Sequence, residues 1–94
     1  MAHVLVRHKV ADFSNWKETF DGSASFRKMG GSKGGVVFRN ANDPNEVVAL
    51  IEWDDLGRAR QFAHSEDLRQ VMQRAGVADR PDLYFLEEVE SAPA

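Results

Sequence analysis

The segment from Glu46 to Trp53, EVVALIEW, constrains the fold more than any other feature, because it is apolar on both of its faces. Successive side chains of a strand point to opposite sides of a sheet, so this pattern is typical of a strand covered on both sides. Only Glu52 is charged between Val47 and Trp53. With 94 residues, the chain has room for a single hydrophobic core around this strand.

The first third of the chain predicts a strand followed by a helix. Residues 3–10 alternate, which places one set of side chains on one face (Val4, Val6, His8, Val10) and a second set on the other (His3, Leu5, Arg7, Lys9). Asp12 or Ser14 then caps a helix with an apolar stripe at helical spacing (Phe13, Trp16, Phe20, Ala24). Gly22 weakens its middle, so either the helix bends there or its far side, with Phe26 and Met29, is covered too.

The rest of the chain predicts a hairpin, a second helical region and a last strand. Glycines at 30, 31, 34 and 35 form a flexible approach to a strand over residues 36–39, and a polar turn over residues 40–45 leads into EVVALIEW. Asp54 or Asp55 caps the next helix, and Ser65 opens a further helical segment that Gly76 ends. Residues 83–89 form the last strand.

This order predicts an α+β, ferredoxin-like βαββαβ domain over residues 1–90, with a disordered tail at 91–94. The helices cover only one face of its antiparallel sheet. We expect the other face to carry Leu5, Leu83 and Phe85 together with one side of EVVALIEW. This is too much apolar surface to face water, so we expect a homodimer that buries it.

Composition and motifs exclude several classes of function. The chain has no cysteine, and its histidines lack metal-binding spacing, so we expect no metal site and no cofactor. The net charge of −3 is spread along the chain, which argues against nucleic acid as a partner. The densest basic run, Arg27, Lys28 and Lys33, is broken by glycines and predicts a solvated loop. No signal peptide or membrane span is visible, and we expect a cytoplasmic protein.

Three residues are candidates for moving protons: His8, Glu52 and Tyr84. His8 interrupts an apolar strand face, where it either serves a bound ligand or is a core histidine with a partner inside the protein. Glu52, near the end of a covered strand, is an acid or base, or else an ion-pair partner of a nearby basic residue (Arg7, Lys9 or Arg39). Tyr84 places a hydroxyl at the end of an apolar body.

Five aromatic residues could either wall a flat ligand or simply fill the core: Trp16, Phe20, Phe38, Trp53 and Phe62. His64 lies beside the helix break at Ser65 and faces either a pocket mouth or solvent.

Three segments carry a resemblance to a known superfamily: VRHKVADFSNWKETF, FRNANDPNEVVALIEWDD and ARQFAHSEDLRQVMQRAGV. With V-x-D before a Trp-bearing helix and E-W-D before an Ala/Phe-patterned helix, residues 3–90 resemble the antibiotic-biosynthesis-monooxygenase-like, dimeric α/β-barrel superfamily. The resemblance implies a dimer whose sheets close into a shared barrel, with a pocket between sheet and helices in each subunit. Some members oxidise aromatic polyketide-like substrates without a cofactor. Others degrade haem with a set of residues that includes an Asn, which this first strand lacks.

Two classes of function therefore stay open. One is a cofactor-independent monooxygenase or cyclase-like enzyme acting on a small, flat, apolar substrate. The other is a non-catalytic, small-ligand-binding or regulatory module on the same fold. An open cavity that reaches His8 would favour the enzyme, whereas a filled pocket would favour the module.

Overall fold

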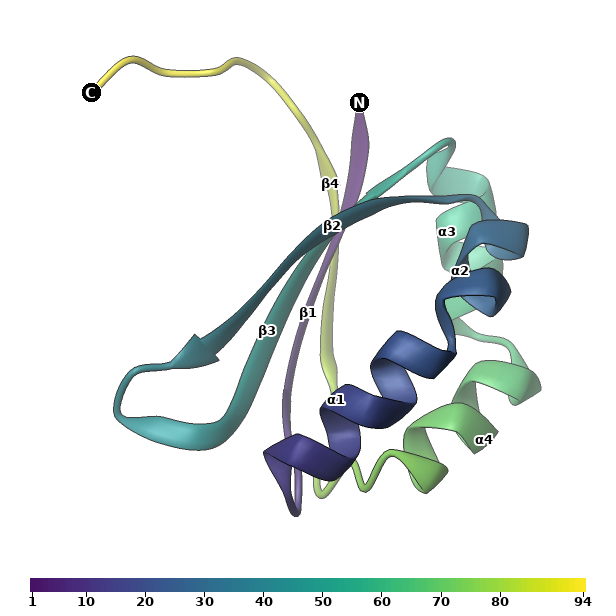
Figure 1. Cartoon of the computed structure of the whole chain (residues 1–94). Coiled ribbons are helices and arrows are strands. Elements are labelled where there is room, and N and C mark those ends of the chain that lie inside the picture. The colour runs from purple at the N-terminus through teal and green to yellow at the C-terminus, as the bar shows by residue number, and fades with distance from the viewer.

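The computed structural model describes residues 1–94 as a four-stranded antiparallel sheet with helices on one side (Figure 1). The strands are β1 (Ala2–Lys9), β2 (Ser32–Asn40), β3 (Asp43–Trp53) and β4 (Asp82–Glu87). The helices are α1 (Phe13–Gly22), α2 (Ala24–Gly30), α3 (Leu56–Ala63) and α4 (Glu66–Arg74). The strand order β2-β3-β1-β4 confirms the ferredoxin-like arrangement. No helix is long and apolar enough to cross a bilayer.

Short polar side chains fix where three of the four helices begin. Asp12, Asp55 and Ser65 each accept a hydrogen bond from a backbone N–H in the first turn that follows. The choice between Asp12 and Ser14, and that between Asp54 and Asp55, is thereby settled. The first helical region breaks at Ser23, next to Gly22, and yields two separate helices.

The hairpin is longer than the sequence predicts. The glycine-rich approach belongs to β2, which begins at Ser32 and pairs with β3 through a bulge between Ser32 and Gly35. A Cβ atom at Gly35 would lie 2.2 Å from the Leu50 carbonyl oxygen, so only glycine allows the strands to approach this closely.

The last strand ends earlier than the sequence predicts. β4 stops at Glu87, and Val89 is exposed.

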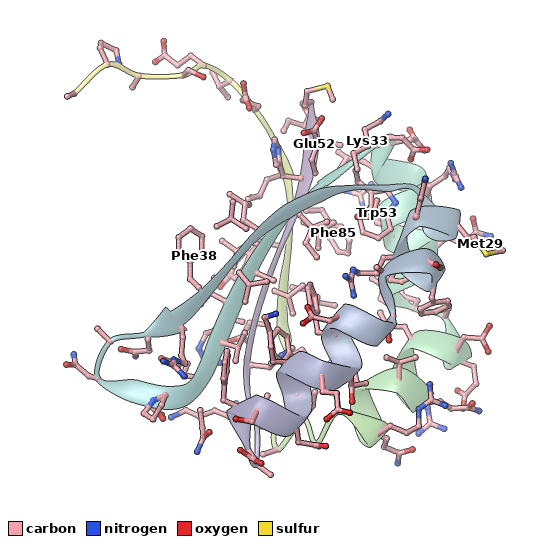
Figure 2. The ribbon with its side chains drawn as sticks, viewed as in Figure 1. Met29, Lys33, Phe38, Glu52, Trp53 and Phe85 are labelled. Carbon is pink, nitrogen blue, oxygen red and sulfur yellow. The ribbon has the colours of Figure 1, made fainter.

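Strand register decides which side chains face the helices. On the helix side, the even-numbered residues of β1 pair with the odd-numbered residues of β3 and β4, for example Val4 with Ile51 and Phe85. The opposite side, here called the bare face, carries seven apolar side chains: Leu5, Val36, Phe38, Val48, Leu50, Tyr84 and Leu86. Figure 2 shows Phe38 pointing away from the helices and Trp53 on their side.

The phase predicted for β4 is therefore wrong. Leu83 and Phe85 pack on the helix-side core, and the neighbours of Leu5 on the bare face are Tyr84 and Leu86. The error arises because both alternating sets in β4 are apolar, so the sequence of this strand does not reveal which set faces inward. Pairing of Leu5 with Tyr84 determines the phase.

Candidate functional site

A cavity of ≈ 90 Å³, here called the central cavity, lies between the helix side of the sheet and the helices. Twenty residues line it and 16 of them are hydrophobic. The four polar ones are His8, Thr19, Ser23 and Arg27. A single water molecule needs roughly 10–15 Å³, so the central cavity is spacious enough for several waters or for part of an apolar ligand.

The hydrophobic core is split into two clusters, both of which contribute walls to the central cavity. One cluster contains Val4 and Trp53, and the other contains Val10 and Trp16. His8 stands in β1 between Val4 and Val10, and Val10 follows directly after the strand. The imidazole of His8 thus lies between the two core clusters.

His8 is the only buried polar residue, with 4% of its surface exposed. Neither Nδ1 nor Nε2 has a hydrogen-bond partner in the protein, and the ring meets Trp16 edge-on with 5.6 Å between centroids. Burial lowers the pKa of His8 below its ordinary 6.5, with a smaller opposing effect from Asp79. The imidazole is therefore neutral at pH 7 and has one nitrogen free to accept a proton. In this structure His8 lacks the internal partner that the alternative of a satisfied core histidine requires.

Aromatic side chains form much of the wall. Trp16 stacks on Phe20 at 4.9 Å, and Phe62 packs against both Phe26 and Trp53 at 4.8 and 5.0 Å. The indole N–H of Trp53 donates to the Gly30 carbonyl oxygen at 3.0 Å, which holds that ring in place. These rings present flat apolar surfaces to the space beside His8.

Helices α2 and α4 cover the central cavity loosely. Neither helix has a fully buried residue, although Phe26 of α2 and three α4 residues (Leu68, Val71 and Met72) line the cavity. The volume is smaller than the roughly 150 Å³ that accommodates a benzene ring in another protein. A ligand with several rings thus needs more space than the cavity has here, and α2 and α4, which have no fully buried residue, are the helices of its wall that packing fixes least.

The structure brings together only some of the predicted site residues. His8, Trp16, Phe20 and Phe62 line the central cavity, as does Trp53. Phe38, Glu52 and Tyr84 lie on the bare face, where Glu52 pairs in register with His3. His64 lines a separate groove along β4. Side chains alternate between the two faces of the sheet along β3 and β4. The residues next to Glu52 and Tyr84 in sequence face the helices, so Glu52 and Tyr84 point to the bare face.

Glu52 also lacks the ion pairs predicted for it. Arg7 pairs with Glu46 and Asp82, both at 2.9 Å, and Lys9 pairs with Asp43 at 2.7 Å. A catalytic role for Glu52 or Tyr84 stays a prediction, and in this structure neither side chain reaches the space beside His8.

Thr19, Ser23 and Arg27 are cavity residues that the sequence reading missed. Arg27 is part of α2 and half-buried, so its prediction as a solvated loop residue is wrong. The signal was present in the spacing, because the three residues recur at every fourth position, as on one face of a continuous helix. In the structure Ser23 is the break between α1 and α2, and all three residues still line the cavity.

Solved structures establish the fold that the sequence resemblance implies. SnoaB, described as a cofactor-independent oxygenase from Streptomyces nogalater, superposes with a TM-score of 0.78 at 14% identity, covering 99% of this chain and 97% of that one. A provisionally assigned antibiotic biosynthesis monooxygenase from Bordetella bronchiseptica gives 0.81 at 13% identity, covering 95% and 97%. No family model matches the sequence, and no curated protein is detectably similar to it. At these identities the similarity is one of fold.

Replacing His8 with leucine should stabilise the protein. The substitution puts an apolar group of similar size where an imidazole has no protein partner, and an unpaired buried polar group costs about 1–3 kcal/mol. We expect His8→Leu to raise the free energy of unfolding by about 1 kcal/mol at pH 7, measured by urea denaturation. A loss of about 2 kcal/mol would mean that His8 has a structural partner.

Stability should also depend on pH through His8. Its folded pKa lies below 6.5, so between these two values the unfolded chain binds a proton that the folded chain does not. The contribution of His8 to the free energy of unfolding is therefore fully present above about pH 6.5. It is lost as the pH falls toward the folded pKa, at up to about 1.4 kcal/mol per pH unit. Denaturation at about pH 7.5 and about pH 5.5 should show this loss in the wild type and a smaller one in His8→Leu. Equal losses would contradict the assignment.

Proposed function

We propose that this chain is a cofactor-independent oxygenase whose flat, apolar substrate binds in the central cavity beside His8. The observation that carries the proposal is the buried His8, neutral at pH 7 and without a hydrogen-bond partner in the protein. A group that costs stability and has no structural partner is typical of a functional site. The fold shared with SnoaB supports the same class of reaction.

His8 would start the reaction by accepting a proton from an acidic C–H group of the substrate. The resulting carbanion gives electrons to dioxygen and forms a peroxide at that carbon. His8 then returns the proton to the terminal peroxide oxygen, which gives a hydroperoxide. His8 next removes the second proton from the same carbon, the C–H electrons form the C=O bond as the O–O bond breaks, and the departing hydroxide takes this proton and leaves as water. A methylene group and dioxygen thus become a carbonyl group and water, and the substrate supplies all the electrons.

The apolar walls favour this chemistry in two ways. They hold a flat ring system by burial of its surface, and they keep bulk water away from the carbanion. The rings of Trp16, Phe20 and Phe62 line the cavity and supply part of that surface. Dioxygen is itself apolar and needs no polar site.

The second candidate is a binding module that uses the same cavity without turnover. The observation in its favour is that no acidic side chain lines the cavity, so His8 has no second acid or base to assist proton transfer. Binding of a flat ligand without consumption of dioxygen would support this candidate over the oxygenase.

Anthrone tests the proposal, because it combines three flat rings with an acidic methylene group. We expect the protein to accelerate dioxygen uptake and formation of anthraquinone above the protein-free background, followed with an oxygen electrode and by absorbance. His8→Leu should reduce the catalysed rate by about 10²–10⁴-fold, the usual contribution of a general base. Since this variant is expected to fold, an unchanged rate would rule out His8 as the base.

We further propose that the chain forms a homodimer through the bare face. Val36, Phe38 and Tyr84 are each more than half exposed, and they continue the apolar surface of Leu5 and Leu50. A contiguous apolar patch of this kind is typical of a protein interface. The resemblance to a dimeric superfamily supports the same contact.

Light scattering during size-exclusion chromatography should give twice the mass of one chain at micromolar concentration. Phe38→Asp places a charge within the bare face and should convert the protein to a monomer. Met29→Asp is the matched control, because Met29 is an exposed apolar residue on α2, away from the bare face, and its substitution should leave the mass unchanged. A monomeric wild type would contradict the proposal.

A further inference from the structure

Arg27 is the only permanently charged side chain that lines the central cavity, and no acidic side chain forms an ion pair with it. The acid whose charge acts on Arg27 is Asp21, which pairs with Lys17 at 2.6 Å. Burial lowers the pKa of Arg27, which shows that its charge is held at a cost. An arginine is nevertheless charged at pH 7. The wall of the cavity thus carries a positive charge that has no direct ion-pair partner.

The guanidinium of Arg27 is oriented by two contacts that leave most of its donors free. Its carbon lies 3.7 Å from the centre of the Phe20 ring, and one N–H donates to the Phe20 carbonyl oxygen at 2.6 Å. A guanidinium has five N–H donors in a planar fork. The contacts with Phe20 therefore fix the plane of the guanidinium and leave most of its N–H donors free to bind a ligand.

A second donor stands on the same helical face. Thr19, Ser23 and Arg27 all line the central cavity. The Ser23 hydroxyl donates to the Thr19 carbonyl oxygen at 2.8 Å, so its hydrogen is already used. No hydrogen bond within the protein uses the Thr19 side-chain hydroxyl, so it is available as a donor to a ligand in the cavity.

A row of rings connects this polar face to His8. Phe20 lies under Arg27, Trp16 stacks on Phe20 at 4.9 Å, and His8 meets Trp16 at 5.6 Å. Phe20 and Trp16, which both line the cavity, therefore lie between Arg27 and the imidazole. The row of rings thus has the cationic Arg27 at one end and the neutral His8 at the other.

We propose that the ligand of the central cavity is a flat aromatic carboxylate whose acid group is bound by Arg27, with Thr19 as a second donor. A carboxylate matches the planar fork with two parallel hydrogen bonds. One cation balances one negative charge, whereas a phosphate dianion would leave a charge unpaired among apolar walls. The inference rests on the proposed function of the cavity and adds the class of ligand: Arg27 anchors the acid and so positions the ring system relative to His8.

Two ligands that differ in one group test the proposal: naphthalene-2-carboxylate and its neutral amide, naphthalene-2-carboxamide. We expect wild-type protein at about pH 8 to bind the carboxylate about 10- to 100-fold more tightly, the usual effect of charge-assisted hydrogen bonds. Arg27→Gln should remove this preference and leave affinity for the amide within about twofold. Calorimetric titration measures both affinities, and amide NMR shifts detect weak binding.

Lys28→Gln is the matched control, because Lys28 is the exposed neighbour of Arg27 on α2 and the substitution changes the net charge equally. This variant should keep the preference for the carboxylate. Equal affinity of wild-type protein for the two ligands, or a preference that survives Arg27→Gln, would overturn the role of Arg27 alone. Failure of both ligands to bind would overturn it together with the proposed binding of flat ligands in the central cavity.

Discussion

The structure depends on how four short helices cover one face of a four-stranded sheet. The helices have 7–10 residues each and span roughly 10–15 Å, whereas β3 has 11 residues and spans roughly 35 Å. Each helical region must therefore break to follow the sheet, at Ser23 in one case and between His64 and Ser65 in the other. Because the layer is bent, its side chains do not meet the sheet along their full length. The core divides into two clusters around a cavity for this reason.

The two faces of the sheet have different roles because side chains alternate between them along β1. On the helix side, Val4 and Val10 anchor the two core clusters and His8 faces the space between them. On the bare face, Leu5 lies within an apolar band, beside Arg7 and its two acidic partners. A shift of one residue in the register of β1 would exchange these roles. The apolar pairing with β3 prevents it, because Val47, Ala49 and Ile51 are all buried on the helix side.

The sequence predicted the fold better than the site, and particular residues show why. The phase of β1 follows from an alternation that only His8 and Leu5 interrupt, and the helix starts follow from local caps such as Asp12 and Ser65. Long-range pairing determines the phase of β4, so Leu83 and Phe85 were predicted on the wrong face. Arg27 was missed because a cluster of charges in sequence resembles a solvated segment. Its contact with Phe20 forms only once α1 and α2 have folded.

The two polar positions of the central cavity differ in charge in a way that constrains the chemistry. Arg27 is half-buried and permanently charged, whereas His8 is buried and neutral at pH 7. A proton taken up by His8 creates a second cation in an apolar space, which is costly unless the carbanion lies next to it. In the reaction proposed above, the imidazolium would therefore persist only while the substrate is an anion, and it would release the proton before the neutral product leaves. This cycle favours reactions that return the proton within the cavity, as the loss of water from a peroxide does.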